Sequence, residues 1–179
     1  CSNCDATYDS HQMMYECAQE GSNLDVVLDY GAIRGVHSPQ SIAANRDPSI
    51  WRYESLLPVG TPSDCSGSLR VVGGTPLFRA KQLENDRKGA QVWVKDDTRL
   101  STASLKDRAS AVVVAYALEN RIKRIITAST GNAGVALAGM AAAAGLESVV
   151  VVPEAAPAEK LAQILVYGAR LVLVRGTYS

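Results

Sequence analysis

The chain lacks an excess of charge of either sign. Its 179 residues carry 18 Lys and Arg side chains against 18 Asp and Glu side chains. Binding to a nucleic-acid backbone normally needs a basic surface. The one local basic cluster, residues 121–124, is better explained as the positive end of a helix. We therefore expect no nucleic-acid partner.

Long apolar runs are missing as well. The longest, residues 133–146, is alanine-rich and falls short of the roughly 20 residues that a membrane-spanning helix needs, so we expect no membrane association. No signal peptide is evident. The four cysteines, without a secretory leader, favour a reducing compartment. These absences together predict a cytoplasmic protein.

One lysine, Lys106, stands in Ser-Thr-Ala-Ser-Leu-Lys-Asp-Arg, directly before an apolar run that predicts a helix over 109–120. Thr102 or Ser104 can cap the first N–H groups of that helix. The positive helix end and partial burial favour the neutral amine, which is the form that attacks an aldehyde. Lys106 is thus a candidate covalent cofactor anchor, although a solvated first-turn lysine fits this segment alone at least as well. The rival Lys95 adjoins two aspartates that would keep it charged.

A second motif is the sequence Ile-Ile-Thr-Ala-Ser-Thr-Gly-Asn-Ala-Gly, residues 125–134. It predicts a strand, a tight turn and a helix start. Such a turn presents backbone N–H groups and the side chains of Ser129, Thr130 and Asn132 to a carboxylate, phosphate or phenolate oxygen. An ordinary turn, in which Gly131 supplies an unusual φ angle and a hydroxyl caps the helix, fits as well. The glycine spacing disfavours a dinucleotide-binding module.

The second half of the chain alternates strands and helices. Two segments, 148–152 and 171–174, are continuously apolar, as expected for parallel strands covered by helices on both faces. The pattern predicts an α/β fold with an incomplete parallel sheet. Its expected order is strand 124–127, helix 132–144, strand 148–152, helix 156–167 and strand 170–174.

The lysine segment, followed by Ser-Thr-Gly-Asn-Ala at 129–133, resembles the fold-type II pyridoxal-phosphate enzymes. That group has the tryptophan synthase β-like fold and includes threonine synthase, threonine dehydratase and cysteine synthase. Within it the chain is most similar to the threonine synthases. Three further segments carry that resemblance: the Cys-rich N-terminus leading into Leu-Asp-Val-Val-Leu-Asp-Tyr at 24–30, Gly-Gly-Thr-Pro-Leu at 73–77, and Val-Trp-Val-Lys-Asp-Asp at 92–97.

The resemblance implies a function and a role for each motif. The expected reaction is that of a pyridoxal-phosphate-dependent lyase, which converts O-phosphohomoserine and water to threonine and phosphate. Lys106 would bind the cofactor and move protons at the α and β carbons of an amino-acid substrate, and Asn132 would hydrogen-bond the phenolic oxygen of the cofactor. The substrate carboxylate would be received by the turn residues Ser129, Thr130, Gly131 and Ala133. A homodimer is expected for the full-length enzyme.

The chain also departs from the group's pattern. Ala103 and Ala109 replace glycines of the group's Asn-Pro-Thr-Gly-Ser-Phe-Lys-Asp-Arg-Gly segment, and an alanine restricts the backbone. After Ala133 no glycine cluster follows that could bind the cofactor's phosphate. We therefore expect the chain to be the N-terminal portion of a longer enzyme, in an incomplete two-domain architecture.

Two other functions fit the same residues. One is a different enzyme of this group, similar to a threonine or serine dehydratase or to cysteine synthase. The other is a truncated homologue without catalytic activity, which would bind at most a ligand or a partner chain.

The cysteines near the N-terminus form a motif of their own. The pattern Cys-x-x-Cys, twelve further residues and Cys-x-x-Glu is that of a zinc ribbon with its last ligand changed. Glu20 is a less usual zinc donor, and His11 or Cys65 could take its place. A decayed metal site is as good an interpretation as a working one. The candidate metal ligands are Cys1, Cys4 and Cys17.

The proline-containing stretch 34–72 predicts an arm with short helices, in which Trp51 and Tyr53 are docking anchors that supply burial. Residues 73–76 predict a plain turn at the start of the catalytic part. The predicted organisation is a Cys-containing knuckle at 1–22, an extended arm at 23–72, part of the large cofactor-binding domain at 73–126 and the start of a small Rossmann-like α/β domain at 127–179.

Overall fold

The computed structural model describes residues 1–9, 15–63, 67–84 and 89–176. The chain divides into two compact units, Cys1–His37 and Ser38–Ser179. The first contains the helix α1, Tyr30–Val36, and an antiparallel bridge between Glu16 and Asn23. The finer division into four parts stays a prediction. In the described part of the chain, no helix is both long enough and apolar enough to cross a membrane.

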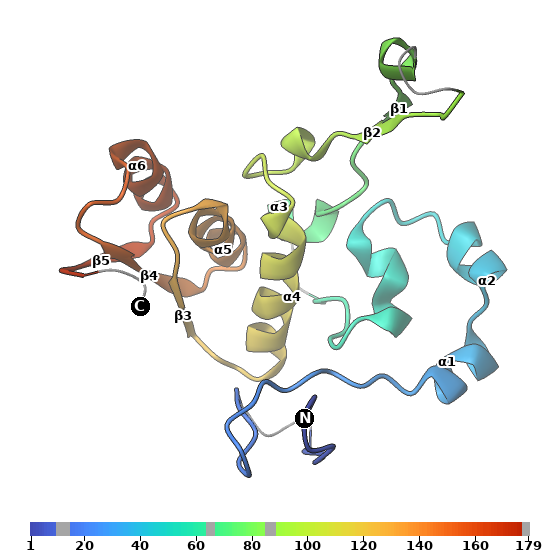
Figure 1. Cartoon of the computed structure of the whole chain (residues 1–179), viewed down its shortest axis with the longest axis horizontal. Helices are drawn as coiled ribbons and strands as arrows, with labels where there is room; N and C mark the ends of the chain where they lie inside the picture. The colour runs from blue at the N-terminus through green and yellow to red at the C-terminus, as the bar shows by residue number, and fades with distance from the viewer. Residues whose placement is uncertain (10–14, 64–66, 85–88, 177–179) are drawn as a thin grey trace. The chain divides into compact units, whose positions relative to one another are not determined.

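The second unit begins with short elements and ends in an alternating α/β series (Figure 1). Its α-helices are α2 (Pro39–Ala44), α3 (Gly67–Val71), α4 (Lys106–Glu119), α5 (Asn132–Ala143) and α6 (Ala158–Val166). Its 3-10 helices are η1 (Ile50–Leu56), η2 (Lys81–Glu84) and η3 (Asp97–Arg99). Its strands are β1 (Leu77–Arg79), β2 (Trp93–Lys95), β3 (Arg124–Ala128), β4 (Glu147–Pro153) and β5 (Arg170–Val174).

The strands form two separate sheets. β1 and β2 pair antiparallel, whereas β3, β4 and β5 form a parallel sheet in that order. The strands of the parallel sheet coincide with apolar runs that are rich in β-branched residues, which fit a pleated surface. The α/β fold and the parallel sheet predicted from the sequence are therefore confirmed.

Helices cover the parallel sheet differently from the sequence-based expectation. Burial alternates along β4, where Val150 and Val152 are fully buried and Val151 between them is half-buried. Figure 1 shows α5 and α6 side by side on one face of the sheet. Two successive crossovers in the same direction place both helices on one face. Among the described residues, close packing on both faces is therefore not found.

Helix α4 begins three residues earlier than predicted, at Lys106. Its apolar positions Ala111, Val114 and Ala115 are fully buried and pack in one core with Leu137 and Met140 of α5. Because small residues allow the two helices to approach closely, α4 and α5 form the central contact of the second unit.

Part of the stretch before the first sheet, around η1 and α3, packs into the same core. Trp51 is buried, and its indole Nε1 donates a hydrogen bond of 2.9 Å to the Leu69 carbonyl. Leu69 and Val72 belong to the same cluster as α4. The anchor role predicted for Trp51 is thus confirmed, whereas that for Tyr53 is wrong, since Tyr53 is 43% exposed.

Replacing Trp51 tests this packing. Trp51→Ala should lower the free energy of unfolding by about 3–5 kcal/mol, because it leaves a large cavity and an unpaired carbonyl. Tyr53→Ala, which truncates a nearby exposed side chain, should lower the free energy of unfolding by less than about 1 kcal/mol. Urea denaturation of both variants measures the difference, and equal losses would contradict the assignment of Trp51 to the core.

Candidate active site

The candidate site is centred on Lys106, the first residue of α4. Ser104 Oγ accepts a hydrogen bond of 3.2 Å from the Lys106 backbone N–H, while Leu105, at the N-cap position of α4, makes no side-chain cap hydrogen bond. The Lys106 side chain is exposed. Among the described residues, its amine has no hydrogen-bond or ion-pair partner, and it is therefore available to a ligand.

A buried carboxylate fixes the loop before α4. Asp107 is fully buried and accepts a hydrogen bond of 2.8 Å from the Thr102 backbone N–H. The Thr102 hydroxyl donates to the other oxygen of the same carboxylate. Thr102 therefore does not cap the helix itself. It closes the loop onto the first turn of α4, which restricts the position of Lys106.

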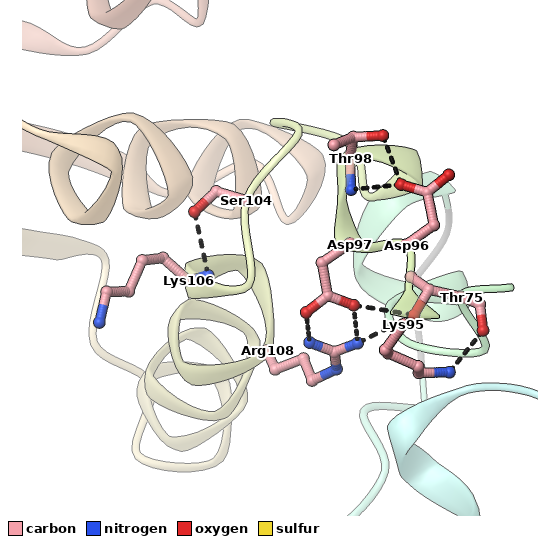
Figure 2. Close-up of polar contacts among 8 residues, drawn as sticks. All are labelled: Thr75, Lys95, Asp96, Asp97, Thr98, Ser104, Lys106 and Arg108. Carbon is pink, nitrogen blue, oxygen red and sulfur yellow. Dashed lines mark hydrogen bonds and ion pairs between the residues drawn. The ribbon is translucent and has the colours of Figure 1, made fainter. Parts of the chain in front are cut away.

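Arg108 holds the same turn from another side. Its guanidinium binds Asp97 through two hydrogen bonds of 2.7 Å, and the Thr75 hydroxyl donates to Asp97 at 2.8 Å. Figure 2 shows this cluster on one side of α4, with the Lys106 side chain extending on the other side. Residues two apart on a helix point to nearly opposite faces, so the ion pair fixes the helix without occupying the lysine.

The ion pair changes the acidity of Asp97. Hydrogen bonds from Arg108, and to a lesser extent from Thr75, lower the pKa of Asp97 to about 2. A bidentate guanidinium–carboxylate pair stabilises the ionised carboxylate strongly. The turn at 73–76 is therefore more than the plain turn predicted, because Thr75 links the first sheet to the Lys106 helix.

Lys95 is bound elsewhere in this cluster. Its ammonium group donates to the Thr75 backbone carbonyl, as Figure 2 shows. The partner of Lys95 is thus a backbone carbonyl, whereas the sequence predicted the neighbouring aspartates. Because this bond occupies its amine, Lys95 is the weaker anchor candidate.

One departure from the group's pattern strains the backbone. Ala103 has φ +56°, in the left-handed region that glycine adopts at little cost and alanine does not. Ala109 lies inside α4, where alanine is the better helix former. The two glycine replacements therefore have opposite consequences for stability.

The second motif forms the turn between β3 and α5. Gly131 has an ordinary extended conformation, φ −106° and ψ −159°, and no side chain caps α5. The alternative interpretation, with an unusual φ and a hydroxyl cap, is therefore wrong. Ser129 Oγ accepts a hydrogen bond of 3.3 Å from the Gly131 N–H. The first N–H groups of α5 are left for an anion.

Asn132 opens α5 and has one partner that the sequence did not indicate. Its side-chain Oδ1 accepts a hydrogen bond of 2.7 Å from Lys160 Nζ of α6. Because the amide oxygen is engaged, the amide Nδ2 is the group directed to donate to a ligand oxygen.

Close backbone contacts position both motifs. A Cβ atom added at Gly134 would lie 2.5 Å from the Ser129 carbonyl oxygen, so glycine is needed where the turn folds back onto α5. A Cβ atom added at Gly139 would lie 2.7 Å from Thr102 Cγ2. α5 thus packs directly against the loop that carries Lys106.

The predicted metal ligands also come together, in the first unit. The ligand atoms of Cys1, Cys4, Cys17 and Glu20 all lie within 4.8 Å of one another. The Tyr8 hydroxyl contacts Cys17 Sγ at 3.1 Å and lowers the pKa of that thiol. The other two candidates, His11 and Cys65, lie outside the described residues.

Sequence reasoning missed the roles of Asp97, Thr75 and Lys160. Asp97 and Thr75 stand well apart from Arg108 in sequence, and only the return of the chain past the first sheet brings them together. Lys160 lies in α6 and Asn132 begins α5, so the chain passes through β4 before the two side chains meet. No local pattern marks such contacts.

The structure is thus that of an α/β protein. It has a parallel sheet, an exposed lysine at a helix start and a glycine-containing turn before the next helix. Comparison with known families specifies the class: residues 69–179 match the family described as "Pyridoxal-phosphate dependent enzyme". The chain belongs to this family, as the resemblance of its two motifs predicted.

Curated relatives of the chain include threonine synthases. The chain is 35% identical over its whole length to the threonine synthase of Methanocaldococcus jannaschii, of which it covers 44%. It is 38% identical to the threonine synthase of Halalkalibacterium halodurans, over 73% of this chain and 38% of that protein. The chain thus spans less than half the length of these relatives.

Solved structures agree on the fold. O-ureido-L-serine synthase matches with a TM-score of 0.57 and 31% identity, over 62% of this chain and 36% of the other. Cysteine synthase from Entamoeba histolytica matches with a TM-score of 0.57 and 28% identity, over 66% of this chain and 38% of the other. The predicted fold-type II architecture, present here in part, is confirmed.

The Asp97–Arg108 pair predicts a dependence of stability on pH. Asp97 has a folded-state pKa of about 2, against an ordinary value of 3.8. The ionised Asp97 therefore contributes on the order of 2 kcal/mol to the free energy of unfolding. This contribution is complete above about pH 4 and is lost as the pH falls through 2. Asp97→Asn should weaken this acid-induced loss, measured by urea denaturation between pH 5 and 2. Identical pH curves for the variant and the original protein would contradict it.

Ala103 and Ala109 give a paired test of the loop conformation. Ala103→Gly should stabilise the fold by about 1 kcal/mol, because relief of the left-handed strain exceeds the entropy cost of glycine. Ala109→Gly should destabilise it by up to about 1 kcal/mol, because glycine is a poor helix former. Thermal unfolding distinguishes the two signs, and destabilisation by both variants would exclude a left-handed Ala103.

Proposed function

We propose that this chain supplies the lysine-bearing part of a pyridoxal-phosphate site of the threonine synthase type. The whole enzyme would convert O-phosphohomoserine and water to threonine and phosphate. The observation that carries the proposal is the Lys106 amine, which has no partner among the described residues although the turn beneath it is fixed by Asp107 and Arg108. Lys95, by contrast, is bound to the Thr75 carbonyl.

The chain's own residues suit the cofactor. Lys106 and Asn132 are the first residues of two helices that pack on each other. The Lys106 loop contacts α5 at Gly139, about 10 Å along the helix axis from Asn132. We propose that both residues contact one cofactor.

The turn before α5 leaves room for a ligand. A Cβ atom added at Gly131 would meet no atom within 4 Å. An anion can therefore approach the backbone there and receive hydrogen bonds from the N–H groups of the turn. We assign this position, with Ser129, Thr130 and Ala133, to the substrate carboxylate.

When bound, pyridoxal phosphate supplies an electron sink that stabilises negative charge on a substrate carbon. Lys106 Nζ would hold the cofactor and move protons at the α and β carbons of the substrate. Asn132 Nδ2 would donate to the phenolic oxygen, with its amide oriented by Lys160. Arg108 and Asp97 would keep the first turn of α4, and so Lys106, in place.

The finer parts of the proposal have unequal support. Cys1, Cys4 and Cys17 are free thiols, which fits a reducing compartment such as the cytoplasm. The lyase reaction rests on the threonine synthase relatives. The homodimer rests on the family resemblance alone.

Borohydride reduction in the presence of pyridoxal phosphate tests the anchor directly. We expect peptide mapping by mass spectrometry to find the cofactor on Lys106 and to find none in Lys106→Ala. Lys123→Ala, which removes another exposed lysine, should leave the labelling unchanged. Equal labelling of Lys81, Lys95 and Lys123 would contradict a preformed site.

Gly131→Ala separates ligand binding from folding. The added methyl group meets no protein atom and the backbone angles suit alanine, so the melting temperature should not fall, and the lower entropy of the unfolded chain should raise it slightly. Protection of Lys106 labelling by an amino-acid substrate should nevertheless weaken, because the methyl group occupies the carboxylate position. Phosphate release from O-phosphohomoserine by the full-length enzyme then tests the reaction itself.

A further inference from the structure

The first unit contains two loops with the same local geometry. In the first, the Cys1 nitrogen donates to the carbonyl of Ala6, five residues on, at 2.8 Å. In the second, Cys17 N–H donates to the carbonyl of Ser22, again five residues on, at 2.8 Å. Glu20 therefore stands in the second loop where Cys4 stands in the first.

The backbone angles support this equivalence. The residue after Cys4, Asp5, has φ +58°, and the residue after Glu20, Gly21, has φ +73°. Both lie in the left-handed region, which residues other than glycine seldom adopt. Each loop thus turns sharply just after its second candidate ligand.

The four ligand atoms are close enough for one metal ion. All lie within 4.8 Å of one another, with 3.6 Å between Cys4 Sγ and Cys17 Sγ and 2.9 Å between Cys1 Sγ and Glu20 Oε1. Zinc–sulfur bonds of about 2.3 Å in a tetrahedron place two sulfurs about 3.8 Å apart. The Cys4–Cys17 separation is close to that value, whereas a disulfide needs about 2.0 Å.

Neighbouring groups hold the ligands in place. Asn3 Nδ2 donates to Glu20 Oε2 at 2.8 Å, which leaves Oε1 to face the thiols. The Tyr8 hydroxyl oxygen accepts from the Ala18 N–H at 3.0 Å, so its own proton is directed to Cys17 Sγ. Such outer contacts are typical of metal sites, where they orient the ligands.

The described residues of the first unit form no apolar core. Among its described residues only Cys17 is buried. Small units without an apolar core usually need a metal or disulfides to keep a fixed structure. Since Cys17 is a candidate ligand and no other described residue of the first unit is buried, the cluster is where stabilisation of this unit is expected.

We propose that Cys1, Cys4, Cys17 and Glu20 bind one zinc ion in a structural site that joins the two loops. Three thiolates favour zinc, and the carboxylate completes a closed tetrahedral site. The site is independent of the proposed pyridoxal-phosphate site, so loss of zinc should not abolish labelling of Lys106.

Metal analysis of the full 179-residue chain, purified under reducing conditions, tests the proposal. We expect one zinc ion per chain and, after exchange for Co²⁺, the thiolate charge-transfer and intense visible bands of a tetrahedral site. Cys17→Ser should abolish these bands, and Glu20→Gln should lose stoichiometric metal. Tyr8→Phe should keep the spectrum but weaken metal affinity about 10-fold or more.

Two control variants address the other possible fourth ligands. Cys65→Ser and His11→Ala should both leave the Co²⁺ spectrum unchanged. Loss of the bands in either variant, with retention in Glu20→Gln, would overturn the assignment of Glu20. A chain that binds neither zinc nor Co²⁺ would overturn the site itself, as would a Cys4–Cys17 disulfide found by mass spectrometry that persists under reducing conditions.

Discussion

The buried carboxylate of Asp107 is the constraint on which the rest of the site depends. It accepts hydrogen bonds from both the backbone and the hydroxyl of Thr102, and the methyl group of Thr102 lies against α5 at Gly139. A buried carboxylate without partners would be very costly. The loop therefore has to close in this way for α4 to pack, and closure determines where Lys106 begins the helix.

The site combines fixed and free groups in a way that suits covalent chemistry. Arg108 is bound to Asp97, and Asn132 is bound to Lys160. Lys106 and the space over Gly131 are open to a ligand. An enzyme needs reacting groups whose supports are held by packing and hydrogen bonds, and this chain provides the supports for two of the expected cofactor contacts.

The first unit relies on a different kind of constraint. Its loops are tied by main-chain hydrogen bonds and by the cluster of three thiols and Glu20, whereas the second unit is held by the α4–α5 core. An apolar core and a metal ligand set are alternative solutions to the entropy cost of ordering a chain. The two units thus differ in what would destabilise them: cavities in one, chelators or oxidation in the other.

The sequence by itself determined many of the local elements and located the two motifs that hold the candidate site residues. Apolar runs located β3, α5, β4, α6 and β5 to within about two residues, and the order of the two motifs indicated the family, because these signals arise from neighbours along the chain. Tertiary structure alone decided that Thr75 and Asp97 hold Arg108, that Lys160 orients Asn132 and that Ala103 is strained. These contacts join segments whose approach depends on the packing of the whole unit, and no local pattern encodes that packing.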